Sequence, residues 1–436
     1  MSSSGRTAAL LGILFGLAAT GTSAATVTLP QLAGELGITP STAAWTISAY
    51  AVVLAVATPL HGRLADAYGI RVPLVLGVIA MAVGAIGSAL APAFPVLLVA
   101  RIVQGFGGAS IPVLATALVS AMWDGPERGA ALGRIAGVSA TFSALGPIMG
   151  GALEDLGGWR LAMTLPALGL VAVPYLLRSA PTGGSGERID RIGAGLVAIA
   201  ASGLVLLLQS PSSGRITAVV GAVLLAAGAP AVVAWVRRRP HGFLPRDVVT
   251  NPVLLRSAFA TAAIPASWFA LLVGVPLAAA SWGWTPLATG LLMLPAAAVG
   301  LVTPWISRRA LDRLGARRSI AVACPIAVAA LLVAATGNAV ASPALLALGV
   351  ALVTVAFGFG QPAMISAVHG AVAAPDRGVA IGVATLVFLV GASVGAALVG
   401  GLGEVAGLAT VFFVMMALPV AGLIVLLLGG RRPALA

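Results

Sequence analysis

The sequence contains no lysine, a single cysteine, three histidines and only twelve acidic residues among 436 positions. One cysteine, Cys324, excludes an intramolecular disulfide framework. The apolar segments hold no paired acids, no cluster of metal ligands and no nucleophile beside a base, which disfavours a membrane-embedded enzyme. No Walker-type glycine loop is present either, so the sequence predicts no nucleotide, cofactor or metal site.

Apolar residues take the place of the missing charge. Hydrophobic residues make up 60% of the chain and charged residues 8%, and the mean hydropathy is +1.09. These values are typical of a polytopic membrane protein. We predict fourteen membrane-spanning helices in a six, two, six plan. The predicted spans are 8–29, 43–61, 72–91, 95–120, 129–153, 159–177, 192–209, 215–236, 254–280, 286–306, 319–337, 343–366, 378–401 and 409–429.

This plan divides the chain into three parts. Residues 1–177 are predicted to form an N-terminal six-helix bundle, and residues 254–436 a C-terminal one. Residues 178–253 are predicted to hold polar linkers and two inserted helices.

The formal net charge of +12 comes from arginines whose placement indicates topology. If the N-terminus is cytoplasmic, nearly all arginines fall in or beside cytoplasmic segments, as the positive-inside rule requires. The charge therefore predicts contact with a lipid bilayer and no nucleic acid. We expect a monomeric multi-pass protein of a bacterial cytoplasmic membrane with both termini cytoplasmic. The exceptions are Arg101, Arg160 and Arg215.

Two short strings occur twice in the same order. The first string is the turn GRLADAYGIR, residues 62–71. Two arginines, an aspartate and a glycine in this turn recur downstream at the same spacing. A second string that begins at Pro126 matches one that begins at Pro375. Both pairs indicate two halves of one ancestral unit. The first pair matches Arg63, Asp66, Gly69 and Arg71 with Arg309, Asp312, Gly315 and Arg317.

The turn at residues 62–71 resembles the loop between helices 2 and 3 of the major facilitator superfamily. The two inserted helices, with Asp190 and Gly193 opening the first, look like the fourteen-helix drug:proton antiporter branch. The resemblance implies an all-α polytopic membrane protein in which two six-helix bundles face a central cavity, with helices 7 and 8 as a peripheral pair. It also implies a latch between the halves, formed at Arg63, Asp66, Arg71 and Asp312.

Arg101 is the one ionisable residue well inside a predicted span. With Gln104 and the following glycines, RIVQGFGG resembles the superfamily's helix 4 motif. Charge inside a membrane is costly and favours a functional role, here a cavity-facing cation that binds substrate. The alternative is a structural arginine that bonds backbone carbonyls and holds helices 1 and 4 together.

Gly146 and Pro147, followed by Gly150 and Gly151, resemble the helix 5 motif associated with exporters in the superfamily. Proline bends a helix and glycine permits close packing, so a hinge is predicted here. Ordinary packing of small residues is the alternative.

Helix 1 departs from the family pattern because Gly21 stands where an aspartate is expected. All acidic residues fall in predicted loops or at helix ends. A cavity with Arg101 and no acid opposite should favour neutral or anionic amphiphiles over cations. Proton coupling is left open, with Asp66, Glu154, Asp155, Glu404 and His369 as candidates.

The predicted function is efflux of a small amphiphilic drug or metabolite by alternating access. A transporter of the same fold for a lipid or another metabolite, without proton antiport, is the alternative. A channel is disfavoured because a fixed pore needs no repeated latch. Helical spacing predicts a cavity lined by Thr22, Thr26, Trp45, Ser48, Arg101, Gln104, Ser139, Phe142, Trp268 and Gln361. For Trp45 and Trp268, a place in the interfacial belt or on the lipid face is the alternative.

Overall fold

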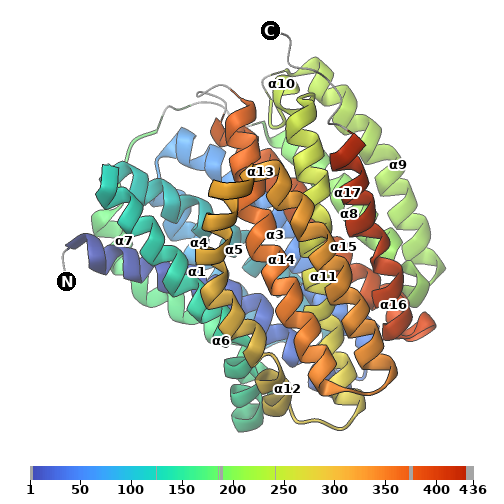
Figure 1. The fold of residues 1–436 in the computed structure, drawn as a ribbon. Coiled ribbons are helices and arrows are strands. Elements are labelled where there is room, and N and C mark those ends of the chain that lie inside the picture. Colours follow the sequence, from blue (N-terminus) through green and yellow to red (C-terminus); the bar gives the residue numbers. More distant parts are fainter. Residues whose placement is uncertain are drawn as a thin grey trace.

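The computed structural model describes residues 3–123, 125–184, 186, 190–240, 242–372 and 377–428. Within these ranges every regular element is a helix (Figure 1). The first part of the chain forms α1 (Ser3–Val27), α2 (Leu29–Glu35), α3 (Pro40–Tyr68), α4 (Arg71–Ala89), α5 (Phe94–Met122), α6 (Gly125–Met163), η1 (Leu165–Ala172) and α7 (Val173–Ser179).

The remainder begins with the two inserted helices and a short connector. These are α8 (Arg191–Ser213), α9 (Arg215–Arg238) and α10 (Arg246–Val249). The last part forms α11 (Pro252–Ser281), α12 (Pro286–Leu292), α13 (Leu294–Ala339), α14 (Pro343–Ala371), α15 (Arg377–Ala406), α16 (Leu408–Met415) and α17 (Ala417–Leu428).

Proline and a polar cap define where several helices begin. Thr39 precedes Pro40, and its side chain accepts a hydrogen bond from Thr42 N at 3.2 Å. Asn251 before Pro252 and Thr285 before Pro286 cap α11 and α12 in the same way. Proline suits the first helical position because its missing N–H would have no partner inside the helix.

Twelve helices in the described residues are long and apolar enough to cross a bilayer, and a bent pair brings the number to thirteen. The bent pair, Leu145–Met163 and Leu165–Ser179, turns by 60° and covers the predicted sixth span. The fold is therefore an all-helical, multi-pass membrane fold, and the number fourteen stays a prediction. The division at residues 177 and 253 also stays a prediction.

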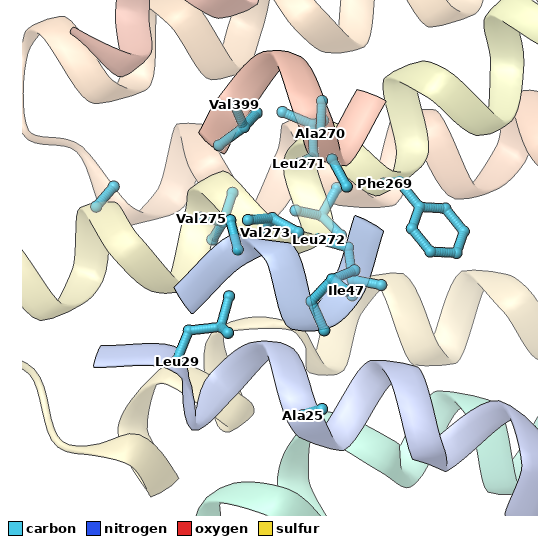
Figure 2. Close-up of a cluster of buried hydrophobic side chains, with 14 of the residues drawn as sticks. Ala25, Leu29, Ile47, Phe269, Ala270, Leu271, Leu272, Val273, Val275 and Val399 are labelled. Atoms are coloured by element: carbon cyan, nitrogen blue, oxygen red, sulfur yellow. The ribbon is translucent and has the colours of Figure 1, made fainter. Parts of the chain in front are cut away.

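The two ends of the molecule differ. We call the end that carries α10 the linker face, and the opposite end, which carries α12, the far face (Figure 1). Near the far face one apolar cluster crosses between the first and last parts of the chain. Figure 2 shows Leu29 and Ile47 beside Val273 and Val399 in this cluster.

Near the linker face the apolar clusters stay mostly within one part. One cluster draws only on α1 and α4–α7 with their flanking residues, and two others only on α11, α13, α14 and α17. The pair α3 and α15 joins the two parts, and Gly382 of α15 lies near Pro59 of α3. The parts are thus packed most broadly at the far face.

The inserted helices are not equivalent. Helix α9 packs on α8 and is otherwise largely exposed, as expected for a peripheral helix. Helix α8 also packs against both α3 and α15, and an apolar cluster joins the three helices. Helix α8 therefore contacts both parts of the chain, and the peripheral placement of the pair stays a prediction.

Close packing of α11 against α15 depends on glycine. A Cβ added at Gly395 would lie 1.9 Å from the carbonyl oxygen of Ala266, which is backbone and cannot rotate away. We expect Gly395→Ala to lower the free energy of unfolding by about 1–3 kcal/mol because the helices must separate. Thermal unfolding of the purified protein in detergent measures the effect.

The matched control is Gly195→Ala in α8. A Cβ at Gly195 meets nothing within 4 Å. Alanine favours a helix over glycine by up to about 1 kcal/mol, so this variant should keep or slightly raise the melting temperature. Equal melting temperatures for the two variants would contradict the packing account.

Candidate functional site

Arg101 lies in the first third of α5, seven residues after Phe94, with none of its surface exposed. Its Nη1 donates to the carbonyl oxygen of Gly21 at 2.7 Å and to Gln104 Oε1 at 2.8 Å. Its Nε donates to the carbonyl oxygen of Thr46 at 3.2 Å, and the guanidinium lies 4.4 Å from the centre of the Tyr50 ring. The cation therefore connects α5 to α1 and α3.

Glycine at position 21 makes room for this arrangement. A Cβ there would lie 2.9 Å from Gln104 Nε2, so the Gln104 side chain occupies the space that a larger residue would need. Tyr50 donates its hydroxyl to the carbonyl oxygen of Ala18 at 3.1 Å and so fixes the ring under the guanidinium. Tyr50 was not among the predicted site residues, and no sequence signal distinguished it from the other residues of its span.

The guanidinium has no carboxylate partner among the described residues. Its Nη2 atom is buried and has no hydrogen-bond partner there. Arg101 has no surface exposed in this conformation. The geometry matches the structural alternative, in which the arginine bonds carbonyls of neighbouring helices, and its part in substrate binding stays a prediction.

Most other predicted lining residues are buried against helices. Thr22 lies beside Tyr50, and Thr26 bonds the carbonyl oxygen of Ser23. Ser139 is 9% exposed, and Phe142 packs against Gly16 of α1.

Trp45 and Ser48 share a face of α3, as predicted, but that face contacts α8. Trp45 Nε1 donates to Ser213 Oγ at 3.1 Å, and Gln209 Nε2 donates to Ser48 Oγ. These two residues therefore line no central cavity in this conformation. Sequence alone could not show which helix would cover them.

The last two predicted lining residues lie in the C-terminal part. Trp268 stacks with Phe269 and Phe357, each at 5.2 Å between ring centres. Gln361 lines an open cavity of about 370 Å³ together with Pro362, Ile365, Ser366 and His369. Gln361 is thus the predicted residue that does reach a cavity, and that cavity lies on the linker side of α14.

The predicted latch is held by the chain's own linkers. Gly69 has φ +80°, and Arg71 Nε donates to the carbonyl oxygen of Ala180 at 2.7 Å. Arg63 Nη2 donates to the carbonyl oxygen of Gly242 at 3.1 Å, and Asp66 also has an interaction partner. In this conformation the two arginines therefore contact the linkers.

The downstream turn reproduces this geometry. Gly315 has φ +75°, and Arg317 Nη2 donates to the carbonyl oxygen of Leu426 at 2.9 Å. Arg71 and Arg317 each lie 109 residues before their acceptor, which is near the end of the last helix of each part. Asp312 is exposed. The second copy of the other repeated string cannot be compared, because Pro375 and Asp376 lie outside the described residues.

Asp190 fixes the start of α8 next to these turns. It accepts from Gly193 N, from Phe243 N and from Trp235 Nε1, and so ties α8, the linker and α9 together. Burial raises the pKa of this carboxyl, but the three hydrogen bonds and Arg239 outweigh it, and the pKa lies below its usual value.

The predicted hinge lies where α6 meets α12. A Cβ at Gly151 would lie 2.4 Å from the carbonyl oxygen of Pro286, and a Cβ at Gly290 would lie 2.5 Å from that of Pro147. Gly146 instead packs against the Ser23 side chain of α1, within the first part of the chain. Gly151 and Gly290 hold the backbones of the two parts together at the far face, and the action of this region as a hinge stays a prediction.

A family model described as Major Facilitator Superfamily matches residues 11–373 and 257–436. The chain belongs to the major facilitator superfamily. It is 32% identical over 308 residues to Stp of Mycobacterium tuberculosis (strain CDC 1551 / Oshkosh), named a multidrug resistance protein, covering 67% of this chain and 56% of Stp. It is 26% identical over 300 residues to the uncharacterized transporter YebQ of Escherichia coli (strain K12), covering 66% of this chain and 65% of YebQ.

A third relative is EfpA of M. tuberculosis (strain CDC 1551 / Oshkosh), named an uncharacterized MFS-type transporter. It is 31% identical over 228 residues, which cover 51% of this chain and 43% of EfpA. The matches thus span less than two thirds of the length of these relatives. They establish the superfamily but not the fourteen-helix branch.

The burial of Glu154 was not predicted from the sequence. The predicted helix ended at residue 153, which placed Glu154 on an exposed rim. Instead α6 stays helical until Gly157 and Gly158, and Glu154 is 3% exposed. Both of its carboxylate oxygens are buried without a hydrogen-bond partner among the described residues. The paired glycines suggested an earlier helix end, and no sequence signal showed that other helices would cover this position.

Loss of the Arg101 guanidinium should destabilise the packing of α1, α3 and α5. We expect Arg101→Ala to cost on the order of 1–3 kcal/mol for each carbonyl left buried without a donor. Arg101→Lys should not restore stability, because one ammonium cannot reach the acceptors that the planar guanidinium spans. Thermal unfolding in detergent reports the loss.

Gln104→Ala serves as a milder control, since it removes one acceptor and leaves both carbonyl contacts in place. Its melting temperature should lie between those of wild type and Arg101→Ala. Wild-type stability of Arg101→Lys would contradict this account of the site.

Proposed function

We propose that this chain is an efflux transporter that moves small neutral or anionic amphiphiles across the bacterial cytoplasmic membrane by alternating access. The linker face is then cytoplasmic. Arginines gather there, with Arg237, Arg238 and Arg239 at the end of α9 and Arg317 and Arg318 after the turn in α13. The positive-inside rule favours this orientation.

The buried guanidinium of Arg101 carries the proposal. It is a cation in a low-dielectric region with an unsatisfied N–H and no carboxylate contact among the described residues. A ligand that supplies an acceptor or a negative charge would satisfy it, whereas a cationic ligand would be repelled. Superfamily membership and the multidrug resistance name of Stp support a drug-like cargo.

Alternating access needs contacts that can separate and reform. At the far face the contacts between α6 and α12 are backbone approaches at glycines, without a polar lock among the described residues. At the linker face Gln361 and His369 line an open cavity. This arrangement supports a state that is packed at the far face and accessible near the linker face, from which cytoplasmic cargo would load.

Flux into or out of liposomes tests the proposal. Purified protein is reconstituted with a pH-sensitive dye inside, and an ion gradient is imposed. Chloramphenicol serves as the neutral probe, novobiocin as the anionic probe and ethidium as the cationic probe. We expect gradient-stimulated movement of the neutral or anionic probe and little movement of ethidium.

Arg101→Gln should lower flux of the anionic probe about tenfold or more, which corresponds to about 1.4 kcal/mol. Arg215→Gln, an exposed arginine at the start of α9, is the matched control and should leave flux unchanged. Robust ethidium transport without transport of the other two probes would overturn the proposed cargo.

A further inference from the structure

A cavity of about 430 Å³ lies at the far face between the first and last parts of the chain. Its wall combines Gln31 of α2 and Glu154 of α6 with Pro276 of α11 and Thr289 of α12. The cavity therefore spans the interface that must separate when the far face opens.

Glu154 is the buried ionisable group in this wall. It is 3% exposed, and neither carboxylate oxygen has a hydrogen-bond partner among the described residues. A carboxylate shielded from water is strongly disfavoured in its charged form unless a cation or hydrogen-bond donors compensate it. The charges and hydrogen-bond donors around Glu154 therefore determine whether its charged or its protonated form is more stable.

Among the described residues, no hydrogen bond or ion pair brings a positive charge to the Glu154 carboxylate. The nearby base, Arg160, is paired with Glu35 of α2, which also accepts from Trp159 Nε1 at 2.9 Å. Gln31 Oε1 is engaged by Trp159 N at 2.8 Å.

The other neighbours add either negative charge or none. Asp155, the next residue in α6, is exposed and negative. From α11, α12 and the turn between them the wall receives Pro276, Ala280, Trp284, Pro286 and Thr289, none of which carries a charge.

We propose that Glu154 is a proton-binding site whose occupancy stabilises the packing of α6 against α12 and so closes the far face. This rests on the proposed function, because only alternating access opens that interface. The close approaches of Gly151 to Pro286 and of Gly290 to Pro147 hold the wall together around the carboxyl group. Separation of the two helices would admit water, and the hydrated carboxyl would ionise.

Proton binding and closure are therefore linked. The protonated form favours the closed far face, so acid closes it. As the pH rises, ionisation favours the hydrated, separated state. Gln in place of Glu154 mimics the neutral form and should hold the far face closed at every pH.

The test measures distances between spin labels on the full chain in lipid nanodiscs. Labels are attached at Leu156→Cys and Leu291→Cys, two exposed positions on α6 and α12, in a Cys324→Ser background. With Glu154 present we expect one short distance at acidic pH and a longer population at alkaline pH. Glu154→Gln should abolish the longer population.

The matched control is Asp155→Asn. It keeps Glu154 but removes a neighbouring negative charge, so the pH response should persist with its midpoint moved to lower pH. A wild-type pH response in Glu154→Gln would overturn the proposal. So would distances that do not depend on pH when Glu154 is present.

Infrared spectroscopy gives a second readout that needs no labels on the helices. At acidic pH, wild-type protein should show the carbonyl stretch of a protonated carboxyl group, shifted by isotopic labelling of glutamate and lost in Glu154→Gln. Absence of such a band in the wild type would overturn the proposal. Neither readout uses a transported probe, so a pH response without flux would overturn export alone, and flux without a pH response would overturn the proton site alone.

Discussion

The structure depends on a buried cation that is neutralised by dipoles and not by an acid. Arg101 is bonded to carbonyl oxygens of α1 and α3 and lies against the ring of Tyr50. Apolar contact alone contributes little to the association of helices within a bilayer, because lipid tails are equally apolar. Hydrogen bonds and close contacts between small residues therefore determine which helices pair. One guanidinium therefore helps to assemble the N-terminal part, and one of its buried nitrogens, Nη2, has no hydrogen-bond partner among the described residues.

Glu154 is the counterpart of Arg101 at the far face. Both groups are buried and neither has an ionic partner among the described residues. They lie at different depths, so they cannot neutralise each other. Arg101 stays charged because a guanidinium holds its proton, whereas a carboxyl group can become neutral by taking one. The same half thus holds both groups on which the proposals rest, a fixed charge proposed to select cargo and a carboxyl group proposed to bind a proton.

Periodicity and turn chemistry predicted much of this fold. The repeated turn spacing corresponds to two glycines with positive φ, Gly69 and Gly315, and the apolar runs match α4 and α5 to within about two residues, whereas α3 extends beyond its predicted end at residue 61. Helix pairing could not be predicted, because an apolar face does not specify its neighbour. That is why Trp45 was assigned to a cavity although it contacts α8, and why Glu154 was placed on an exposed rim.

The most direct test introduces a carboxylate beside Arg101, where the described residues provide none, and measures the effect on transport. Gly21→Asp would place a carboxylate beside Arg101 after a shift of the Gln104 side chain, which is flexible. If the uncompensated cation selects the cargo, the ratio of anionic to cationic probe flux in liposomes should fall about tenfold or more in Gly21→Asp. It should fall far less in Gly21→Asn, which has the same shape without the charge. An unchanged ratio in Gly21→Asp would contradict the account.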